Sequence, residues 1–461
     1  MGMSLQPVIL WTDALLFLLL LACVLAALHV RDNEPLRDAW GKVGRRPIGM
    51  AAATVLLAFV LVGLLDSLHY RARLPDLPAA AQPAPDAAGG VNGPVYSSEV
   101  LSALDALVAP LRLQTEKTYS APFAATLYQR ETVQLPGGGQ QRVHPRLTHG
   151  AAHLANPDAE RGGDIAVRAL SALGMAALGG GLAFLLVAWG VARAEHLPFA
   201  EAVSAILRGR TVLAWRAALG TLAVLLAIVS TWVMLAPHYH VFGTDKVGQD
   251  VLYLALKSVR TALVIGTLTT LVMMPFAVAL GIAAGYLGGW VDDAVQYVYT
   301  VLNAIPGVLL IAAAVLMMQV VIDTHPQWFD TAAQRSDARL LALCFILGIT
   351  SWTGLARLLR GETLKLRELE YVQAARAFGV GTAAILRRHI LPNVMHIVLI
   401  ALVMDFSGLV LAEAVLSYVG IGVDPTTISF GTMINMARAE LAREPMVWWS
   451  LAAAFVFMFV L

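Results

Sequence analysis

The sequence predicts an all-helical integral membrane protein, and three observations lead to this prediction. The chain of 461 residues is 58% hydrophobic and only 14% charged, whereas soluble domains carry about 25% charged residues. Its mean hydropathy is +0.70. Apolar runs of about 20 residues, the length that crosses a bilayer as a helix, recur along the chain. The net charge of +1 gives no argument for a nucleic-acid partner.

We predict nine membrane spans, the last of them short. The first apolar run has no basic region before it and no small-residue cleavage site after it, so we expect a retained helix rather than a signal peptide. Only the sixteen residues from Met446 onward remain for the ninth span, and we expect that helix to be truncated. The predicted spans are residues 8–29, 47–66, 166–192, 213–236, 257–287, 292–321, 339–359, 394–420 and 446–461.

Basic residues in three loops predict the orientation. The loops follow the first, third and seventh spans, and nine alternating spans place all three on one side. Because Lys and Arg gather in cytoplasmic loops, we expect the N-terminus outside and the C-terminus inside. The basic residues are Arg31, Arg37, Lys42, Arg45, Arg46, Arg193, Arg208, Arg210, Arg357, Arg360, Lys365, Arg367, Arg376, Arg387 and Arg388.

The long outer segment, residues 67–165, divides by composition. Residues 72–94 are rich in Pro, Ala and Gly and lack the apolar area to fold, so we expect their deletion to leave assembly intact. Residues 96–135 carry enough apolar side chains for a short amphipathic helix or two, with Pro110 ending the first. The stretch "LPGGGQQ" predicts a turn. We interpret the segment as a cap docked on the outer mouth, and an enzymatic or sensory domain is the alternative.

Four residues inside the predicted spans are candidates for function. Asp405 and Glu413 lie eight positions apart in the 394–420 span, about 80° apart around a helix. Ionisable groups in a membrane are costly and often functional. The pair could form a proton relay, or each could be held by a neighbouring helix. Pro275 and Pro306 lie inside spans and should kink their helices.

The sequence contains no G-x-x-x-x-G-K-[ST] phosphate loop, H-E-x-x-H or G-x-S-x-G motif. Any pumping energy must therefore come from an ion gradient or another subunit. His144, His149 and His153 have metal-like spacing, but Pro and Gly between them favour a loop, and we predict no metal site. His238 and His240 flank the end of a span, where we expect them at the membrane interface.

The stretch "HVFGTDKVGQDVL", residues 240–252, predicts tight turns and a helix start. Gly243 and Gly248 suit turns, and Asp250 can cap the helix that leads into the fifth span.

A basic stretch, "YVQAARAFGVGTAAILRRHILPN", lies between two apolar spans at residues 371–393. It predicts a helix over residues 368–378, a stop at Gly379, and a second helix over 382–389 capped by Thr382. Pro392 then stands near the start of the next span. The small side chains of the first helix suit insertion into a partner's groove, and an amphipathic loop on the headgroups is the alternative.

This stretch resembles the cytoplasmic loop of ABC importer permeases, patterned E-A-A-x3-G-x9-I-x-L-P. Glutamine replaces the glutamate of the pattern and histidine its isoleucine. The form "RHILPN" is the one seen in the dipeptide, oligopeptide and nickel branch. The matching positions are Gln373, Ala374, Ala375, Gly379, His389, Leu391 and Pro392.

Three further stretches resemble the same branch. "GTDKVGQD" is similar to its outer-loop motif G-T-D-x-x-G-R-D, with Gln249 in place of arginine. "GYLGGWVDD", residues 285–293, and "LAEAVLSYVGIGV", residues 411–423, follow in the right order. The outer motif positions are Gly243, Thr244, Asp245, Gly248 and Asp250.

The resemblance covers residues 213–461 and implies a six-helix type I ABC importer permease core with a cytoplasmic coupling loop at 360–393. Residues 1–66, 67–165 and 166–212 would form a three-span N-terminal extension with a long periplasmic segment. The implied assembly, in a bacterial inner membrane, joins a second, non-identical permease, two cytoplasmic ATPases and a periplasmic solute-binding protein. ATP and Mg would bind the ATPases, with no catalytic residue or cofactor on this chain, and peptides are the implied solute.

Overall fold

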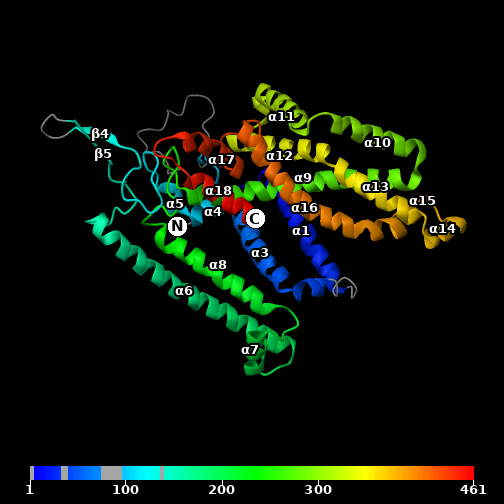
Figure 1. Cartoon of the computed structure of the whole chain (residues 1–461), viewed down its shortest axis with the longest axis horizontal. Coiled ribbons are helices and arrows are strands. Elements are labelled where there is room, and N and C mark those ends of the chain that lie inside the picture. Colours follow the sequence, from blue (N-terminus) through cyan, green and yellow to red (C-terminus); the bar gives the residue numbers. More distant parts are fainter. Residues whose placement is uncertain (1–4, 33–39, 74–95, 135–139) are drawn as a thin grey trace, which may run out of the picture.

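Long helices build the molecule (Figure 1). The computed structural model describes residues 5–32, 40–73, 96–134 and 140–461. Within these ranges, eight helical segments are long and apolar enough to cross a membrane. The helices of the N-terminal part are α1 (Trp11–Asp32), α3 (Pro47–Ser67), α6 (Pro157–Ala194), α7 (Phe199–Arg208) and α8 (Trp215–Leu235).

The second half begins with α9 and ends with a short apolar helix. Its elements are α9 (Val251–Leu287), α10 (Gly289–Ala304), α11 (Gly307–Thr324), η2 (Pro326–Trp328), α12 (Ala332–Ser351), α13 (Thr353–Arg367), α14 (Glu370–Ala377), α15 (Thr382–Ile385), η3 (Leu386–Ile390), α16 (Leu391–Val419), α17 (Phe430–Arg438), η4 (Ala439–Ala442) and α18 (Trp449–Val460).

Eight of the nine predicted spans contain such a long apolar segment, and the ninth corresponds to α18, of 12 residues. The prediction of one kinked helix over 292–321 is wrong, because the chain breaks there into α10 and α11. Ile305, before the break, is extended with φ −89° and ψ 131°. The residue before a proline is pushed out of the helical region, and Pro306 takes the N-cap position of α11. By contrast, α9 continues through Pro275.

Helix α9 is the central element of the core. Buried residues occur along most of its length, and it packs against α3, α12, α13 and α16. Gly281 and Gly285 allow a close approach to α13: a Cβ at either would lie 2.7 Å from a backbone oxygen, of Ala356 or Arg360. These glycines explain why two long helices lie in direct backbone contact.

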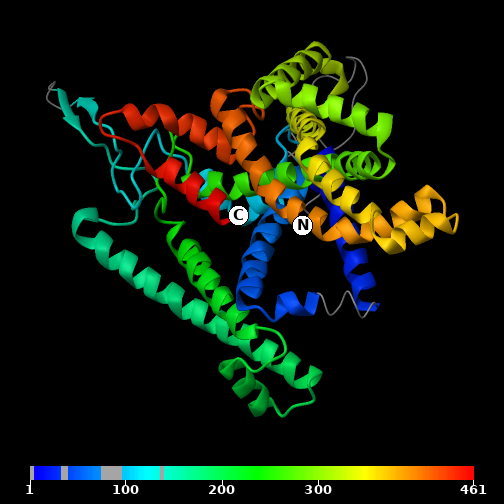
Figure 2. The same cartoon turned by 45° about the vertical axis from the view of Figure 1, so that its right-hand side comes forward.

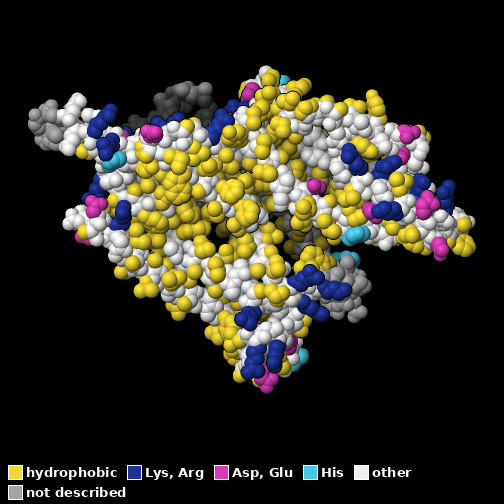
Figure 3. Space-filling view, viewed as in Figure 1, with side chains coloured by type: hydrophobic (Ala, Val, Ile, Leu, Met, Phe, Trp, Pro, Cys, Tyr) yellow, Lys and Arg dark blue, Asp and Glu magenta, His cyan; other side chains and the backbone are white. Residues whose placement is uncertain are grey.

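The N-terminal helices form a second layer on one side of this core. Helices α6 and α8 lie side by side and diverge from the core helices (Figures 1 and 2). Exposed apolar side chains cover them, and Figure 3 shows this hydrophobic surface in yellow. A surface of this kind is suited to lipid.

The outer segment contains strands that the sequence did not predict. β1 (Leu5–Val8), β2 (His69–Ala72) and β3 (Leu101–Ser102) form a three-stranded sheet, in which residues 5–8 pair with the strand that follows α3. β4 (Glu131–Gln134) pairs antiparallel with β5 (Gln140–Val143). The predicted turn between these two strands lies largely outside the described residues, as do residues 74–95.

The short helices of this segment follow the sequence prediction with one shift. Helix α4 (Ala103–Leu107) ends before the proline, and α5 (Ala109–Leu113) carries Pro110 in its first turn. A proline is tolerated there because the first-turn N–H groups have no partner within the helix. The capping box of Ser102 and Asp105 starts α4.

The polar ends of the molecule are separated. The β4–β5 hairpin and α4–α5 lie at one end, and α7 and α14–α15 lie toward the other (Figures 1 and 2). Basic side chains gather around α7 and around the α13–α15 end (Figure 3). These two basic regions lie away from the β4–β5 hairpin.

Candidate functional site

The loop between α13 and α16 is held firmly at its base. Val372 of α14, Ile385 of α15 and Ile390 of η3 are buried in one hydrophobic cluster with residues of α9, α13 and α16. Tyr371 adds a polar contact, because Asn393 Nδ2 donates to its hydroxyl oxygen at 3.0 Å. The loop is therefore a rigid projection of the core.

Gly379 ends α14 in the way that the sequence predicts. Its φ of +77° lies in the left-handed region, which side chains disfavour. The N–H of Gly379 donates to the Arg376 carbonyl at 3.0 Å, and the N–H of Val380 donates to the Ala375 carbonyl at 3.1 Å. This pair of bonds is the Schellman motif. A Cβ at Gly379 would meet nothing within 4 Å, so the requirement for glycine is conformational.

The prediction of a separate second helix capped by Thr382 is wrong. Gly381 holds the N-cap position without a side-chain hydrogen bond, and Thr382 is the first helical residue. The helix continues through the π-turn η3, which contains His389, directly into α16. A π-helical turn is a local irregularity in an otherwise continuous α-helix. Pro392 lies just after this one.

The tip of the loop is exposed and apolar. Phe378 is 88% exposed, with Tyr371 and Val380 also exposed. Ala374 faces solvent and Ala375 is half-buried. Large apolar groups at the tip of a rigid projection mark an interaction surface. The side-chain Nε2 of Gln373 donates a hydrogen bond to the Glu368 carbonyl oxygen of the same loop, at 3.2 Å.

The stretch at 285–293 fastens the base of this loop to the core. Arg360 of α13 makes a two-pronged ion pair with Asp292 of α10, with nitrogen–oxygen distances of 2.5 and 2.7 Å. Arg367 Nη1 donates to the Gly285 carbonyl oxygen at 3.3 Å. Gly288, with φ +65°, makes the turn between α9 and α10. A movement of α13 must therefore act on α9 and α10.

The outer motif, residues 243–250, is packed under the outer segment. A Cβ at Gly248 would lie 1.8 Å from the Glu116 carbonyl oxygen, and one at Gly243 would lie 2.4 Å from that of Ser120. Both glycines have positive φ, as the predicted turns require. Thr244 Oγ1 accepts a hydrogen bond from the Ser120 N–H at 2.7 Å.

The carboxylates of this motif organise its own backbone. Asp250 caps α9, as predicted, by accepting from the N–H groups of Leu252 and Tyr253. Asp245 Oδ1 accepts from the N–H groups of Val247 and Gln249 at 3.0 and 2.8 Å. Burial raises the pKa of Asp245, and these backbone bonds oppose the rise.

His240, which the sequence predicts at the membrane interface, is enclosed by protein. His240 is 1% exposed, and its Nδ1 lies 2.8 Å from Asp250 Oδ2. Its Nε2 lies 3.3 Å from Glu116 Oε1. Burial lowers the pKa of His240, but the hydrogen bonds to the two carboxylates outweigh it and raise the pKa to about 9. The side chain is therefore a buried cation at neutral pH.

Glu116 is the matching buried anion of the outer segment. It accepts hydrogen bonds from the N–H groups of Thr148, His149 and Gly150 at 2.7 to 3.1 Å. Burial raises its pKa, but the bonds from His240 and these three amides bring the pKa to about 2. The outer segment and the motif are thus joined through a buried ion pair.

The two acidic candidates of α16 have different surroundings. Glu413 is 1% exposed and accepts from Ser417 Oγ at 2.6 Å and from Ser429 Oγ, the N-cap of α17, at 2.9 Å. Position 431, next to Glu413, requires glycine, because a Cβ there would lie 2.9 Å from Glu413 Oε1. Asp405 is partly exposed and borders a cavity. Glu413 therefore joins α16 to α17, which favours the interpretation that a neighbouring helix holds it.

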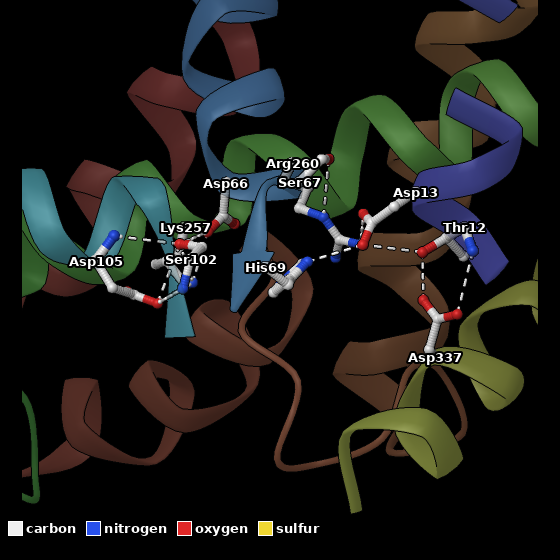
Figure 4. A network of polar contacts seen from close by, with 10 residues as sticks. All are labelled: Thr12, Asp13, Asp66, Ser67, His69, Ser102, Asp105, Lys257, Arg260 and Asp337. Atoms are coloured by element: carbon white, nitrogen blue, oxygen red, sulfur yellow. Dashed lines mark hydrogen bonds and ion pairs between the residues drawn. The ribbon is translucent and has the colours of Figure 1, made fainter. Parts of the chain in front are cut away.

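A buried polar network, which the sequence did not predict, joins the N-terminal extension to the core (Figure 4). Lys257 of α9 lies 2.6 Å from Asp66 Oδ1 of α3 and 3.1 Å from Asp105 Oδ2 of α4. Ser102 Oγ donates to Asp66 at 2.6 Å, and Tyr253 donates to Asp105 at 2.8 Å. One ammonium thus bridges two carboxylates of the extension.

Arg260, one turn further along α9, makes the second half of the network. Its Nη2 lies 2.5 Å from Asp13 Oδ1 and donates to Thr12 Oγ1 at 3.0 Å, and its Nε donates to Ser67 at 3.2 Å. His69 Nδ1 lies 2.7 Å from the other Asp13 oxygen. Figure 4 shows Lys257 and Arg260 directed to separate carboxylates of the extension.

Asp337 of α12 adds a further helix to the network. It accepts hydrogen bonds from the backbone N–H and the hydroxyl of Thr12. The start of α1 is therefore held between α9 and α12. The signal was present in the sequence: Asp13, Asp66 and Arg260 are ionisable residues at or inside apolar runs, the property that identified Asp405 and Glu413.

Comparison with known proteins shows a family match in the C-terminal part of the chain. Residues 277–461 match the family described as "Binding-protein-dependent transport system inner membrane component". These residues form a permease domain of that family. The stretches at 285–293, 371–393 and 411–423 lie inside the matched residues, and the outer motif precedes them. With its apolar helices, the chain is a multi-pass membrane protein.

Three relatives illustrate the similarity. The oligopeptide transport system permease protein OppC of Mycobacterium tuberculosis is 31% identical over 209 residues, covering 45% of this chain and 66% of the relative. The glutathione transport system permease protein GsiD of Pectobacterium atrosepticum is 32% identical over 208 residues, covering 45% and 63%. The dipeptide transport system permease protein DppC of Bacillus subtilis is 29% identical over 212 residues, covering 46% and 60%. The chain thus spans less than two thirds of the length of each.

Proposed function

We propose that this chain is the membrane-spanning permease subunit of an ATP-driven importer for short peptides. It would form half of the translocation pathway. The printed names of the three relatives, which refer to oligopeptides, dipeptides and glutathione, support the solute class. The chain contains no phosphate loop of its own, so the energy would come from partner ATPases.

The observation that carries the proposal is the rigid loop with an exposed apolar tip between α13 and α16. Its base is fixed by Val372, Ile385 and the Arg360–Asp292 pair, while Phe378 at its tip has no cover among the described residues. A partner that grips this tip would move α13, and through it α9. Such a rigid-body movement would switch the pathway between its two sides when the ATPases bind ATP.

The proposed assembly contains a second, non-identical permease, two cytoplasmic ATPases and a periplasmic solute-binding protein. The chain would lie in a bacterial inner membrane with its N-terminus in the periplasm and its C-terminus in the cytoplasm. The basic side chains around α7 and around the α13–α15 end, away from the β4–β5 hairpin, support this orientation.

The experiment that tests the proposal places an arginine on α14. Ala374 is exposed, so Ala374→Arg should fold, yet it should block the approach of an ATPase subunit. We expect co-purification of the ATPases and solute-stimulated ATP hydrolysis to fall at least tenfold. The matched control is Ala159→Arg, an exposed alanine at the outer end of α6. Unchanged co-purification and hydrolysis with Ala374→Arg would contradict the proposal.

A further inference from the structure

A cavity of about 630 Å³ opens between α13 and α16. This is the size of a small-molecule binding site. Its walls are mostly apolar, and four polar side chains interrupt them. The lining residues are Ser351, Gly354, Leu355, Leu358, Glu362, His396, Ile397, Ile400, Ala401, Met404 and Asp405.

Only one of the two carboxylates on the wall has a charge partner. Glu362 pairs with Lys365, whose Nζ lies 2.7 Å from Glu362 Oε1. No residue that the structure describes pairs with Asp405 or donates a hydrogen bond to it. Asp405 lies inside α16, within the segment long enough to span the membrane. The cavity wall therefore carries one carboxyl group with no partner among the described residues.

An unpaired carboxylate in a membrane span is costly and needs a cation or water. The cavity gives it access to a solute. We propose that Asp405 binds the ammonium group of the transported solute, the free amino terminus of a short peptide, as the solute passes through the cavity. This inference rests on the proposed function and names the group that the permease itself recognises.

The length of the cavity agrees with such a solute. His396 and Asp405 are nine residues apart on α16, which corresponds to about 14 Å at 1.5 Å per residue. An extended peptide spans about 3.3 to 3.6 Å per residue, so this distance accommodates roughly four residues. A peptide held by its amino terminus at Asp405 would lie along the wall formed by Leu358, Ile397 and Ala401. Apolar walls of this kind accept many side chains.

Two other partners would account for the unpaired carboxyl group of Asp405. A basic residue of the second permease could pair with Asp405 across the subunit interface. A proton could neutralise it, as a proton relay requires. Each occupant gives a different experimental outcome.

The experiment uses the complete reconstituted transporter in proteoliposomes, with saturating solute-binding protein and radiolabelled tri-alanine as the probe. We expect Asp405→Asn to lower ATP-driven uptake of tri-alanine at least tenfold and Asp405→Glu to restore most of it. The matched control is Glu201→Gln, which makes the same type of carboxylate-to-amide change at an exposed residue of α7, outside the cavity. It should stay within twofold of the wild type, because Glu201 does not line the cavity.

The outcomes separate the inference from the proposed function. A wild-type complex that takes up no tri-alanine with ATP contradicts the proposed function for peptides. Wild-type uptake that Asp405→Asn leaves unchanged overturns the inference alone. Loss of the second permease from purified Asp405→Asn complexes, or collapse of wild-type uptake with a protonophore, also overturns it in favour of the other occupants. Retained assembly, insensitivity to the protonophore and the expected uptake pattern support it.

Discussion

The docking of the N-terminal extension depends on the buried Arg260–Asp13 pair, and replacing Arg260 by methionine tests this directly. Methionine keeps an unbranched side chain but removes every hydrogen-bond donor. Asp13 is fully buried, and its Oδ1 would lose the guanidinium at 2.5 Å. His69 would remain as its hydrogen-bond partner, at 2.7 Å. The variant therefore leaves a buried carboxylate with one partner in place of two.

The expected magnitude follows from this arrangement. Removing one partner of a buried ion pair costs about 3–5 kcal/mol, because the other charge stays buried. His69 retains part of the compensation, so we expect a loss near 3 kcal/mol in the free energy of unfolding. The control is Lys365→Met, which breaks an ion pair whose lysine is 73% exposed. Exposed pairs contribute about 0–1 kcal/mol.

The assay is equilibrium unfolding of the purified protein in mild detergent, with a denaturing detergent as titrant. The double variant Asp13→Asn with Arg260→Met should recover at least about 1 kcal/mol relative to Arg260→Met, because neighbouring charges couple by about 0.5–3 kcal/mol. A loss below about 1 kcal/mol for Arg260→Met, equal to that of Lys365→Met, would refute the reasoning. So would a double variant less stable than the single one.

Three further predictions concern Gly379, the pair formed by His240 and Glu116, and residues 74–95. Gly379→Val forces a side chain into the left-handed region, at about 1–2 kcal/mol. Amide hydrogen exchange in α14 should accelerate roughly five- to thirtyfold, whereas Gly381→Ala, at φ −62°, should change it little. The His240 contribution to stability is complete below pH 6.5 and lost as the pH rises to about 9, and the Glu116 contribution is lost as the pH falls from 4.5 to about 2. His240→Gln should therefore flatten the alkaline part of the unfolding profile, and an unchanged profile would contradict this. Replacing residues 74–95 by Asn-Gly should leave unfolding unchanged, because the residues on either side already pair antiparallel, and aggregation would count against it.

The sequence predicted the features that depend on local conformation. Gly379 with its positive φ, the N-cap role of Asp250 and the turns at Gly243 and Gly248 were all predicted from neighbouring residues. Eight long apolar helices follow from composition and length in the same way. Such features need only the chemistry of a few adjacent residues.

The features that the sequence did not predict depend on long-range contacts. Arg260 and Asp13 are 247 positions apart, and Glu116 and His240 are 124 apart. The residues adjacent to each of these four side chains form no pattern that indicates its distant partner. The strands are short as well, and β1 becomes a strand only because β2 pairs with it. The break at Pro306 was a different error, since proline can either kink or end a helix.

The course of α9 connects the two ends of the molecule. Its 37 residues extend about 55 Å at 1.5 Å per residue. Near its start, Lys257 and Arg260 hold the extension through buried ion pairs, and near its end Gly281 and Gly285 hold α13 in backbone contact. Because both attachments are buried, a displacement of α13 that moves α9 as a rigid body must also carry α1 and α3. The extension therefore belongs mechanically to the core, and an account of transport in which α9 moves without α1 would have to break the Arg260–Asp13 pair.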